Sequence, residues 1–264
     1  MRNSASVTLG AATALILQAG VSFAEDDAEL AKQLANPVAN LISVPFQGNY
    51  DCCFGPSEAG QYTLNLQPVI PFTLSEDLSL IVRTILPTIQ QGELAPGYGS
   101  HFGLGDTTQS FFLAPALKNG WVFGAGPAFL WPTATESELG SGVWGAGPTA
   151  VLLKQMDGWT VGVLANQIWS YAGPDSRDDY SKAFVQPFIN YTFPDTTSLL
   201  LNTESTYDWQ SGDWTIPINV GISKIFKFGD QRVSLGAMGR YYAAAPEDGP
   251  EWGVRLIATF LFPK

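Results

Sequence analysis

Charged residues are scarce in this 264-residue chain, and long apolar runs are absent beyond its N-terminal region. Asp, Glu, Lys and Arg make up 14% of the residues, whereas about 25% is usual for a soluble domain. No segment after residue 24 reaches the roughly 20 apolar residues that a transmembrane helix needs. The formal net charge is −11, and nucleic-acid phosphates require clustered Lys and Arg. The composition therefore argues against a helical membrane bundle and against nucleic acid as a partner.

Histidine is almost absent, which leaves little for catalysis or metal binding. His101 is the only histidine, and it lies beside Ser100 and near Asp106 in a Gly-rich segment. A Ser–His pair suggests a hydrolase, but adjacent residues rarely present both side chains to one substrate. A metal site would need further ligands, and the sequence shows no carboxylates clustered around this histidine. We predict no catalytic residue, no metal site and no cofactor.

Cysteine is limited to one adjacent pair, Cys52 and Cys53. Exported proteins meet an oxidising compartment, so a disulfide within the pair, two free thiols and a bond to another protein are the alternatives. The pair does not directly follow the N-terminal leader, so we do not interpret it as a lipid-anchor site. A structural or incidental pair is favoured over a redox role.

The first 24 residues have the pattern of a signal peptide. Arg2 supplies a positive start, residues 11–17 form an apolar core, and Ser22 and Ala24 are small residues at the spacing of a signal-peptidase site. The alternative is an N-terminal membrane anchor, but the core is shorter than a membrane-spanning helix. We predict cleavage after Ala24 and export of the remaining chain.

Apolar and polar residues alternate from residue 40 to the end of the chain. In residues 61–68 the even positions are apolar, and the odd positions are Gln, Thr, Asn and Gln. Successive side chains of a strand point to opposite faces, so each strand has an apolar and a polar face. About twelve strands are predicted, at residues 41–50, 60–73, 78–90, 107–117, 121–132, 143–154, 159–171, 182–193, 198–210, 214–226, 232–243 and 251–262.

The connections between these strands alternate between long and short. Residues 51–59 and 91–106 are predicted as long loops, residues 118–120 form a tight turn, and only residues 211–213 break the alternation. Bacterial barrels have short periplasmic turns and long external loops. We therefore predict an all-β fold, a transmembrane antiparallel β-barrel at residues 41–264 in the outer membrane of a Gram-negative bacterium, with both termini periplasmic.

All eight tryptophans fall at the ends of predicted strands. Tryptophan favours the membrane interface because its ring is apolar and its N–H can donate a hydrogen bond to headgroups or water. The predicted aromatic girdle consists of Trp131, Trp144, Trp169, Trp209, Trp214 and Trp252 at the outer ends and Trp121 and Trp159 at the inner ends. The expected partners are outer-membrane lipid and lipopolysaccharide, whose phosphates the acidic external loops could bridge through divalent cations. A solvated charged rim is the simpler alternative.

The polar faces of the strands are predicted to line a lumen. An arginine at mid-depth on the lipid side would cost roughly 2–4 kcal/mol, so the strand arginines are assigned to the interior. The predicted lumen residues are Asn65, Gln67, Arg83, Asn166, Gln186, Asn190, Asn202, Glu204, Asn219, Arg240 and Arg255. This wet, amide-rich interior could be a selective passage, or a hydrogen-bonded filling that seals the barrel.

Residues 25–40 form a separate N-terminal segment that contains the one plausible helix. Leu30 and Leu34 lie on one edge, and Pro37 ends the run. So short a helix is marginal in water unless it docks. Two Gly-Ala-Gly-Pro stretches, 124–127 and 145–148, place their glycines inward and could let the segment pack closely, although glycine kinks for curvature are an alternative. We predict a plug at or inside the periplasmic mouth, against the alternative of a partly ordered tail.

Six prolines fall inside predicted strands, where a closed sheet has no edge to hide a missing donor. They are Pro68, Pro115, Pro127, Pro148, Pro187 and Pro217. Bulges or local breaks in the strands are therefore expected at these positions.

Three segments carry a family resemblance. Residues 34–47 (LANPVANLISVPFQ), 66–72 (LQPVIPF) and 80–87 (LIVRTILP) resemble a bacterial family of exported β-barrel proteins labelled as transporters of the meta pathway of phenol degradation, and sometimes, misleadingly, as neuromedin U. The resemblance implies an outer-membrane barrel and the barrel assembly machinery as a partner. The chain departs from the usual terminal aromatic, because Phe262 is followed by Pro263 and Lys264.

Two function classes follow. The first is a passive channel or transporter for a small, aromatic or hydrophobic solute. The second is a closed structural or adhesive barrel without transport, and an outer-membrane hydrolase is a distant third. An open lumen would favour the first class, and a lumen blocked by the N-terminal segment and by Arg–Glu pairs would favour the second.

Overall fold

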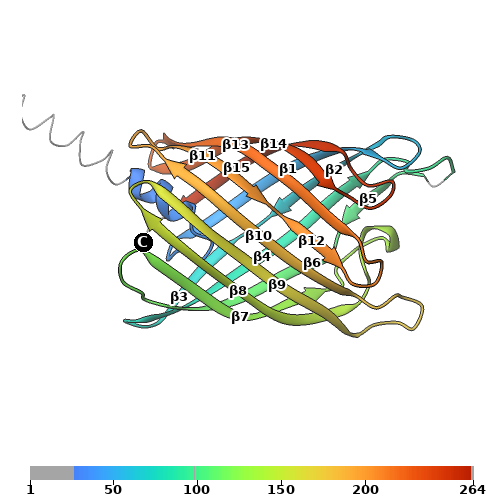
Figure 1. Cartoon of the computed structure of the whole chain (residues 1–264), viewed down its shortest axis with the longest axis horizontal. Coiled ribbons are helices and arrows are strands. Elements are labelled where there is room, and N and C mark those ends of the chain that lie inside the picture. Colours follow the sequence, from blue (N-terminus) through green and yellow to red (C-terminus); the bar gives the residue numbers. More distant parts are fainter. Residues whose placement is uncertain (1–26, 98, 263–264) are drawn as a thin grey trace, which may run out of the picture.

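The computed structural model describes residues 27–97 and 99–262, which form a closed antiparallel β-barrel of twelve strands with a short helix near the N-terminus (Figure 1). This confirms the predicted fold class. The predicted signal peptide lies outside the described residues, as do Pro263 and Lys264. None of the described helices is long and apolar enough to cross a membrane.

Nine of the twelve strands are continuous and three are interrupted. The continuous strands are β1 (Ile42–Phe54), β4 (Leu78–Gln91), β7 (Trp121–Trp131), β8 (Trp144–Met156), β9 (Trp159–Ala172), β10 (Ser181–Thr192), β13 (Trp214–Phe228), β14 (Gln231–Ala244) and β15 (Trp252–Phe262). The interrupted strands are β2 (Ala59–Leu66) with β3 (Val69–Ser75), β5 (His101–Leu104) with β6 (Thr107–Pro115), and β11 (Thr197–Thr203) with β12 (Ser205–Asp208). A 3-10 turn, η1 (Ser137–Leu139), lies in one of the loops.

Each strand pairs with its neighbours in the chain, and the first pairs with the last. The β1–β15 register runs from Ile42 opposite Phe262 to Cys52 opposite Trp252, which closes the ring. The N-terminal helix and the end of β15 lie at the same end of the barrel, on the left in Figure 1. We call this the turn end, because its connections are short, and we call the opposite end the loop end.

The interruptions and irregularities follow the prolines in part. Pro68 lies in the gap between β2 and β3, and the β13–β14 register shifts between Ile216 and Pro217. Pro127 faces Pro148 across β7 and β8, so two residues without a backbone N–H share one site in the wall. The expectation of breaks and bulges is met at Pro68 and Pro217.

The prediction of a long first loop at residues 51–59 is wrong. Strand β1 continues to Phe54 and β2 begins at Ala59, so the connection is the short turn 55–58, with Gly55 at φ +65°. The expected loop 91–106 likewise contains strand β5, which pairs with β4. Pairing satisfies backbone N–H and C=O groups that a loop would leave to water, so the sheet continues past the alternating segments.

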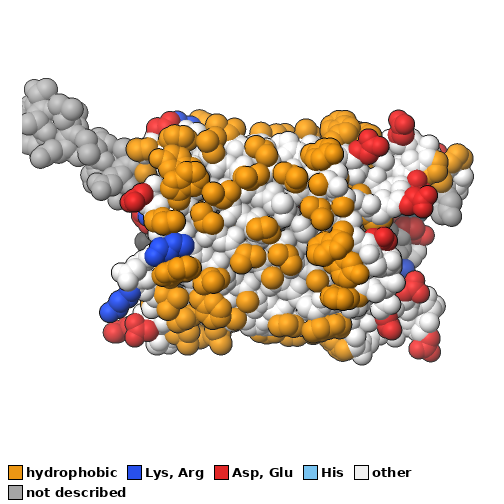
Figure 2. Space-filling view, viewed as in Figure 1, with side chains coloured by type: hydrophobic (Ala, Val, Ile, Leu, Met, Phe, Trp, Pro, Cys, Tyr) orange, Lys and Arg blue, Asp and Glu red, His pale blue; other side chains and the backbone are white. Residues whose placement is uncertain are grey.

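The outer surface of the barrel is apolar between its two ends (Figure 2). Leu256 is 66% exposed and Val220 is 59% exposed, although both lie in the middle of their strands. Soluble proteins rarely expose a continuous apolar surface of this kind, whereas a barrel in lipid requires it. Acidic side chains gather over the loop end in the same view.

The sequence suggested a polar interior, but part of the inner wall is apolar. A buried apolar cluster covers the inner wall from β4 to β10; it consists of Ile81, Phe112, Val151, Leu153, Leu164 and Phe188, with Val38 of the N-terminal segment. In residues 150–153 (AVLL) both faces of the strand are apolar, which is typical of a strand buried on both sides. This lack of alternation is the signal that could have revealed the apolar wall.

Candidate functional site: a chamber between two obstructions

The N-terminal segment, here residues 27–40, docks on the turn end of the barrel. Residues 27–34 are helical, and Leu30 and Ala31 are buried against Leu41, Ile225 and Leu261. Full burial of one leucine is worth roughly 1.5–3 kcal/mol, which offsets part of the cost of ordering a short helix. The helix is therefore held by the barrel wall rather than by its own stability.

Polar contacts show that this segment lies across the mouth. The carbonyl of Lys32 accepts a hydrogen bond of 2.8 Å from Nε2 of Gln155 on β8, whereas Leu30 packs near Leu261 on β15. Strands β8 and β15 are six strands apart in the ring of twelve, and so lie on opposite sides. An ion pair between Asp27 and Arg232 of β14 adds a third attachment.

The inward glycines contribute to this docking at one position. A Cβ at Gly124 would lie 3.5 Å from Cγ1 of Val38, so the segment packs there against a wall without a side chain. At Gly126 and Gly147, by contrast, a Cβ would collide with the carbonyl oxygens of Phe111 and Gln167 on neighbouring strands. Those two glycines allow neighbouring strands to approach closely and do not contribute to the docking of the N-terminal segment.

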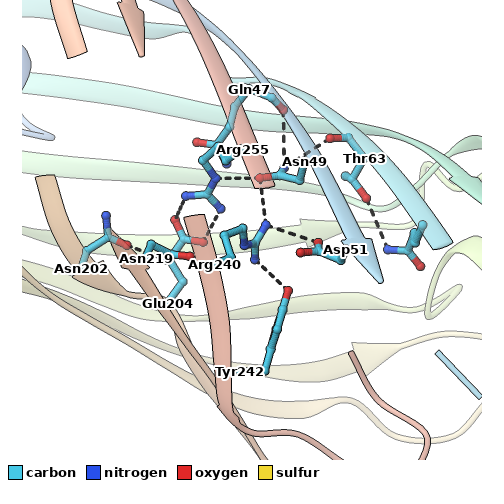
Figure 3. Close-up of polar contacts among 11 residues, drawn as sticks. Gln47, Asn49, Asp51, Thr63, Asn202, Glu204, Asn219, Arg240, Tyr242 and Arg255 are labelled. Atoms are coloured by element: carbon cyan, nitrogen blue, oxygen red, sulfur yellow. Dashed lines mark hydrogen bonds and ion pairs between the residues drawn. The ribbon is translucent and has the colours of Figure 1, made fainter. Parts of the chain in front are cut away.

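A second obstruction is a network of side chains that project from the wall (Figure 3). Arg255 binds both carboxylate oxygens of Glu204 at 2.7 Å, and its Nε donates to Oδ1 of Asn49 at 2.6 Å. Glu204 lies in the break between β11 and β12. A paired guanidinium and carboxylate of this geometry form the strongest type of ion pair, so the pair joins β15 to β11 through the lumen.

Arg240 extends the network toward the loop end. Its Nη1 donates to Oδ1 of Asn49 at 2.8 Å and lies 3.3 Å from Oδ2 of Asp51. Its Nη2 donates to the hydroxyl of Tyr242 at 2.9 Å. The side chains of Arg240 and Asp51 are 8% and 9% exposed, so the network is shielded from bulk water.

A cavity of about 240 Å³ lies between the two obstructions. The N-terminal segment lines it from the turn end, and Glu204 and Arg255 line it from the network. We call this cavity the chamber. Its wall combines apolar side chains, including Val69 and Phe188, with amides and Arg83.

The structure brings seven of the eleven predicted lumen residues to the chamber: Gln67, Arg83, Gln186, Asn190, Asn202, Glu204 and Arg255. Asn219 is fully buried and donates to Oδ1 of Asn202 at 2.8 Å, and Arg240 lies in the network. Asn65 pairs with Gln47 of β1, and Asn166 with Thr149 of β8; neither lines the chamber.

The tryptophans lie at the strand ends, most of them exposed on the outer surface. Trp121, Trp144, Trp159, Trp169, Trp209, Trp214 and Trp252 are each more than 40% exposed. Trp131 is less exposed and packs edge-on against Trp144, with ring centroids 5.4 Å apart. Trp209 also donates its Nε1–H to Gln167 at 2.9 Å. Their placement suits the interface role that the sequence suggested.

The expectation that no carboxylates gather near His101 is wrong. Nδ1 of His101 lies 2.7 Å from Glu136 and 3.9 Å from Glu138, because the loop after β7 folds back over β5. A hydrogen bond from Ser137 holds the pKa of Glu138 below its usual range. Asp106 does not join this group, since its Oδ2 accepts a hydrogen bond of 2.6 Å from Ser141. The three ligand atoms could hold a cation; without one, a protonated His101 would pair with the two carboxylates.

The two cysteines are free thiols at the end of β1. Cys53 has φ +77°, and the β1–β2 register shifts between Asp51 and Phe54. The pair therefore lies in a bulge near the loop end, which fits a structural role.

Comparison with known proteins supports the architecture. No protein-family model and no curated protein sequence matches the chain. Among solved structures, the chain is similar to the COG4313 outer membrane channel from Pseudomonas putida F1, with 17% identity over 84% of this chain and 96% of that chain, at a TM-score of 0.67. The β domain of the Bordetella autotransporter BrkA matches at 8% identity over 84% of this chain and all of that chain, at a TM-score of 0.49. At these identities the first match shows a shared barrel fold.

Proposed function

We propose that the protein is an outer-membrane channel for small solutes whose passage is restricted by the N-terminal segment. The observation that carries this proposal is the way in which the N-terminal segment is attached to the barrel. The segment reaches opposite walls of the mouth through an apolar cluster, one ion pair and one hydrogen bond, without entering the sheet. Such an element can leave while the barrel stays closed.

The orientation follows from the connections. Short turns face the periplasm in bacterial barrels and long loops face outward, so the turn end and both termini are assigned to the periplasm. Lipid and lipopolysaccharide would then meet the outer surface, and the barrel assembly machinery would insert the chain. The similarity to an outer membrane channel supports the outer-membrane location.

The solute is inferred from the chamber. Its wall includes apolar residues beside amides and an arginine, which suits a molecule with an apolar body and a polar end. Transport of aromatic compounds, as in the meta pathway of phenol degradation, is compatible with this wall and remains a prediction from the sequence resemblance.

Conductance in planar bilayers tests the proposal. The mature protein should conduct weakly, and deletion of residues 27–40 should raise the conductance while heat-modifiable gel mobility shows a folded barrel. Glu29→Gln is the matched control: Glu29 is on the helix with its side chain 58% exposed, so this variant should behave as the parent protein. An unchanged, substantial conductance in the deletion variant would overturn the restriction by the segment.

A closed structural barrel is the second candidate, and the network that holds the Arg255–Glu204 pair and the Arg240–Asp51 pair is the observation that favours it. This network joins several strands through the lumen and could block it without the segment. Negligible conductance in both the mature protein and the deletion variant would establish this alternative.

A further inference from the structure

Arg83 differs from the other two arginines of the lumen because it has no carboxylate partner. Arg255 is bound to Glu204 and Arg240 lies beside Asp51. Arg83 donates to Oε1 of Gln67 at 3.2 Å, and no carboxylate of the described residues lies within ion-pair distance. Its guanidinium lines the chamber. A cation in an enclosed site is stabilised by a nearby negative charge. The carboxylate of Glu204 acts on Arg83 only at longer range and is already bound to Arg255, so Arg83 is left without a directly bound carboxylate.

The opposite wall also presents polar groups without partners. Asn190 on β10 is 8% exposed and lines the chamber, yet its side chain makes no hydrogen bond within the described chain. Gln186, four residues earlier on the same inward face, lines the chamber and is likewise unpaired. Asn190 is buried and Gln186 is partly exposed, and buried amides are almost always hydrogen-bonded in folded proteins. Neither amide is spent on a contact within the described chain, so both are available to a solute in the chamber.

Apolar side chains complete the chamber. Phe188 lies between the two amides on β10, and Val69 lies beside Arg83 across the β3–β4 pairing. Leu200 and Met238 also contribute to the lining. A cavity of about 150 Å³ accommodates benzene, so the chamber's volume of about 240 Å³ has room for one ring and a carboxylate.

We propose that the chamber is a binding site for a small monocarboxylic acid with an apolar body about the size of a benzene ring. The carboxylate binds the guanidinium of Arg83, which can donate two parallel N–H hydrogen bonds to it. The apolar body packs against Val69 and Phe188. Where the acid carries a hydroxyl at its far end, that hydroxyl hydrogen-bonds to the amides of Asn190 and Gln186. This assignment rests on the proposed function in that it names the class of solute that passes.

Direct binding to the purified mature protein in detergent tests the site. Isothermal titration with sodium benzoate should show one site, and benzyl alcohol, which has the ring without the charge, should bind much more weakly. Arg83→Gln should weaken benzoate binding by about 10- to 100-fold, since a charged hydrogen bond is lost, and Arg83→Lys should recover part of it. 4-Hydroxybenzoate should bind more tightly than benzoate, and this difference should vanish in Asn190→Ala.

Lys182→Gln is the matched control, because it removes a positive charge from β10 at a residue that pairs with Asp208 at 2.9 Å and does not line the chamber. Its benzoate affinity should equal that of the parent. Equal affinity for benzoate and benzyl alcohol, or displacement of benzoate by chloride at equal concentration, would overturn the proposal without any variant. A protein that binds benzoate but does not conduct would disprove only the channel, whereas a conducting protein that ignores benzoate would disprove only this site.

Discussion

The two obstructions of the lumen are built in opposite ways. The N-terminal segment is held mainly by an apolar cluster around Leu30 and belongs to no strand. The network around Arg255 is held by charged hydrogen bonds, and its side chains are fixed to strands that form the wall. One obstruction is a separable part, and the other is a property of the barrel.

The N-terminal segment should therefore control passage through the lumen, whereas the network should contribute to the stability of the barrel. Removing the segment costs the barrel no strand pairing, so it should change passage and leave the fold intact. Breaking the network leaves a buried charge without its partner, so it should change stability first. Each prediction below tests one side of this contrast.

The largest effect is expected from Glu204→Gln. It leaves Arg255, whose side chain is 3% exposed, without its carboxylate, which should cost about 3–5 kcal/mol of unfolding free energy. Urea unfolding in lipid vesicles measures this loss. Asp208→Asn is the control: its partner Lys182 is 38% exposed, so it should cost about 1 kcal/mol or less. Equal losses in the two variants would contradict the contrast.

Leu30→Ala should act on the segment alone. Truncating a buried leucine costs about 2–5 kcal/mol of the docking free energy, because Leu30 is 7% exposed within its cluster. Planar-bilayer conductance should therefore rise toward that of the deletion variant, with the urea midpoint of the barrel unchanged. A lower urea midpoint without a change in conductance would show that the segment is part of the fold.

Asp27→Asn should have a smaller effect of the same kind. It removes the ion pair with Arg232, in which both side chains are about one-fifth exposed, but it leaves the apolar cluster around Leu30 in place. Conductance should rise slightly, and more at low salt, where screening is weaker. Arg232→Gln should give the same increase, and the double variant should add nothing further.

The smallest effect concerns Asp195 and Lys224, which form an exposed ion pair at the turn end, with side chains 62% and 41% exposed. A hydrogen bond from Lys224, 2.7 Å long, holds the pKa of Asp195 below its usual range. This pair stabilises the fold above the ordinary aspartate pKa, and the contribution is lost as pH falls through the lowered value. A slight fall of the urea midpoint in acid should disappear in Lys224→Gln. Conductance should not respond.

The strands could be predicted from the sequence because lipid imposes one rule on every strand. One face must be apolar and the backbone must pair in a closed ring, so alternation in residues 61–68 and the strand-end tryptophans were sufficient. Breaks near Pro68 and Pro217 followed from the missing donors. The N-terminal helix was visible from the spacing of Leu30 and Leu34.

The arrangement of the interior could not be predicted in the same way. The pairing of arginines with carboxylates depends on the three-dimensional course of the strands. The spacing of residues in the sequence therefore did not indicate that Arg255 pairs with Glu204 or that Arg83 has no bound carboxylate. The carboxylates around His101 come from a loop more than 30 residues away in the chain. Local pattern does not report contacts of that kind.

The cluster beneath the N-terminal helix has a consequence for the order of folding. Leu30 and Ala31 lie near the start of the chain, but they rest on Ile225 and Leu261, close to its end, and Leu41 and Leu261 flank the β1–β15 seam. The helix at residues 27–34 is synthesised early, yet it has no complete docking surface until the last strand has joined the first. Contacts of such long sequence separation form late and slowly. The helix can therefore dock only after β1 and β15 have paired. A barrel in which this pairing is incomplete would leave the helix undocked and the mouth open.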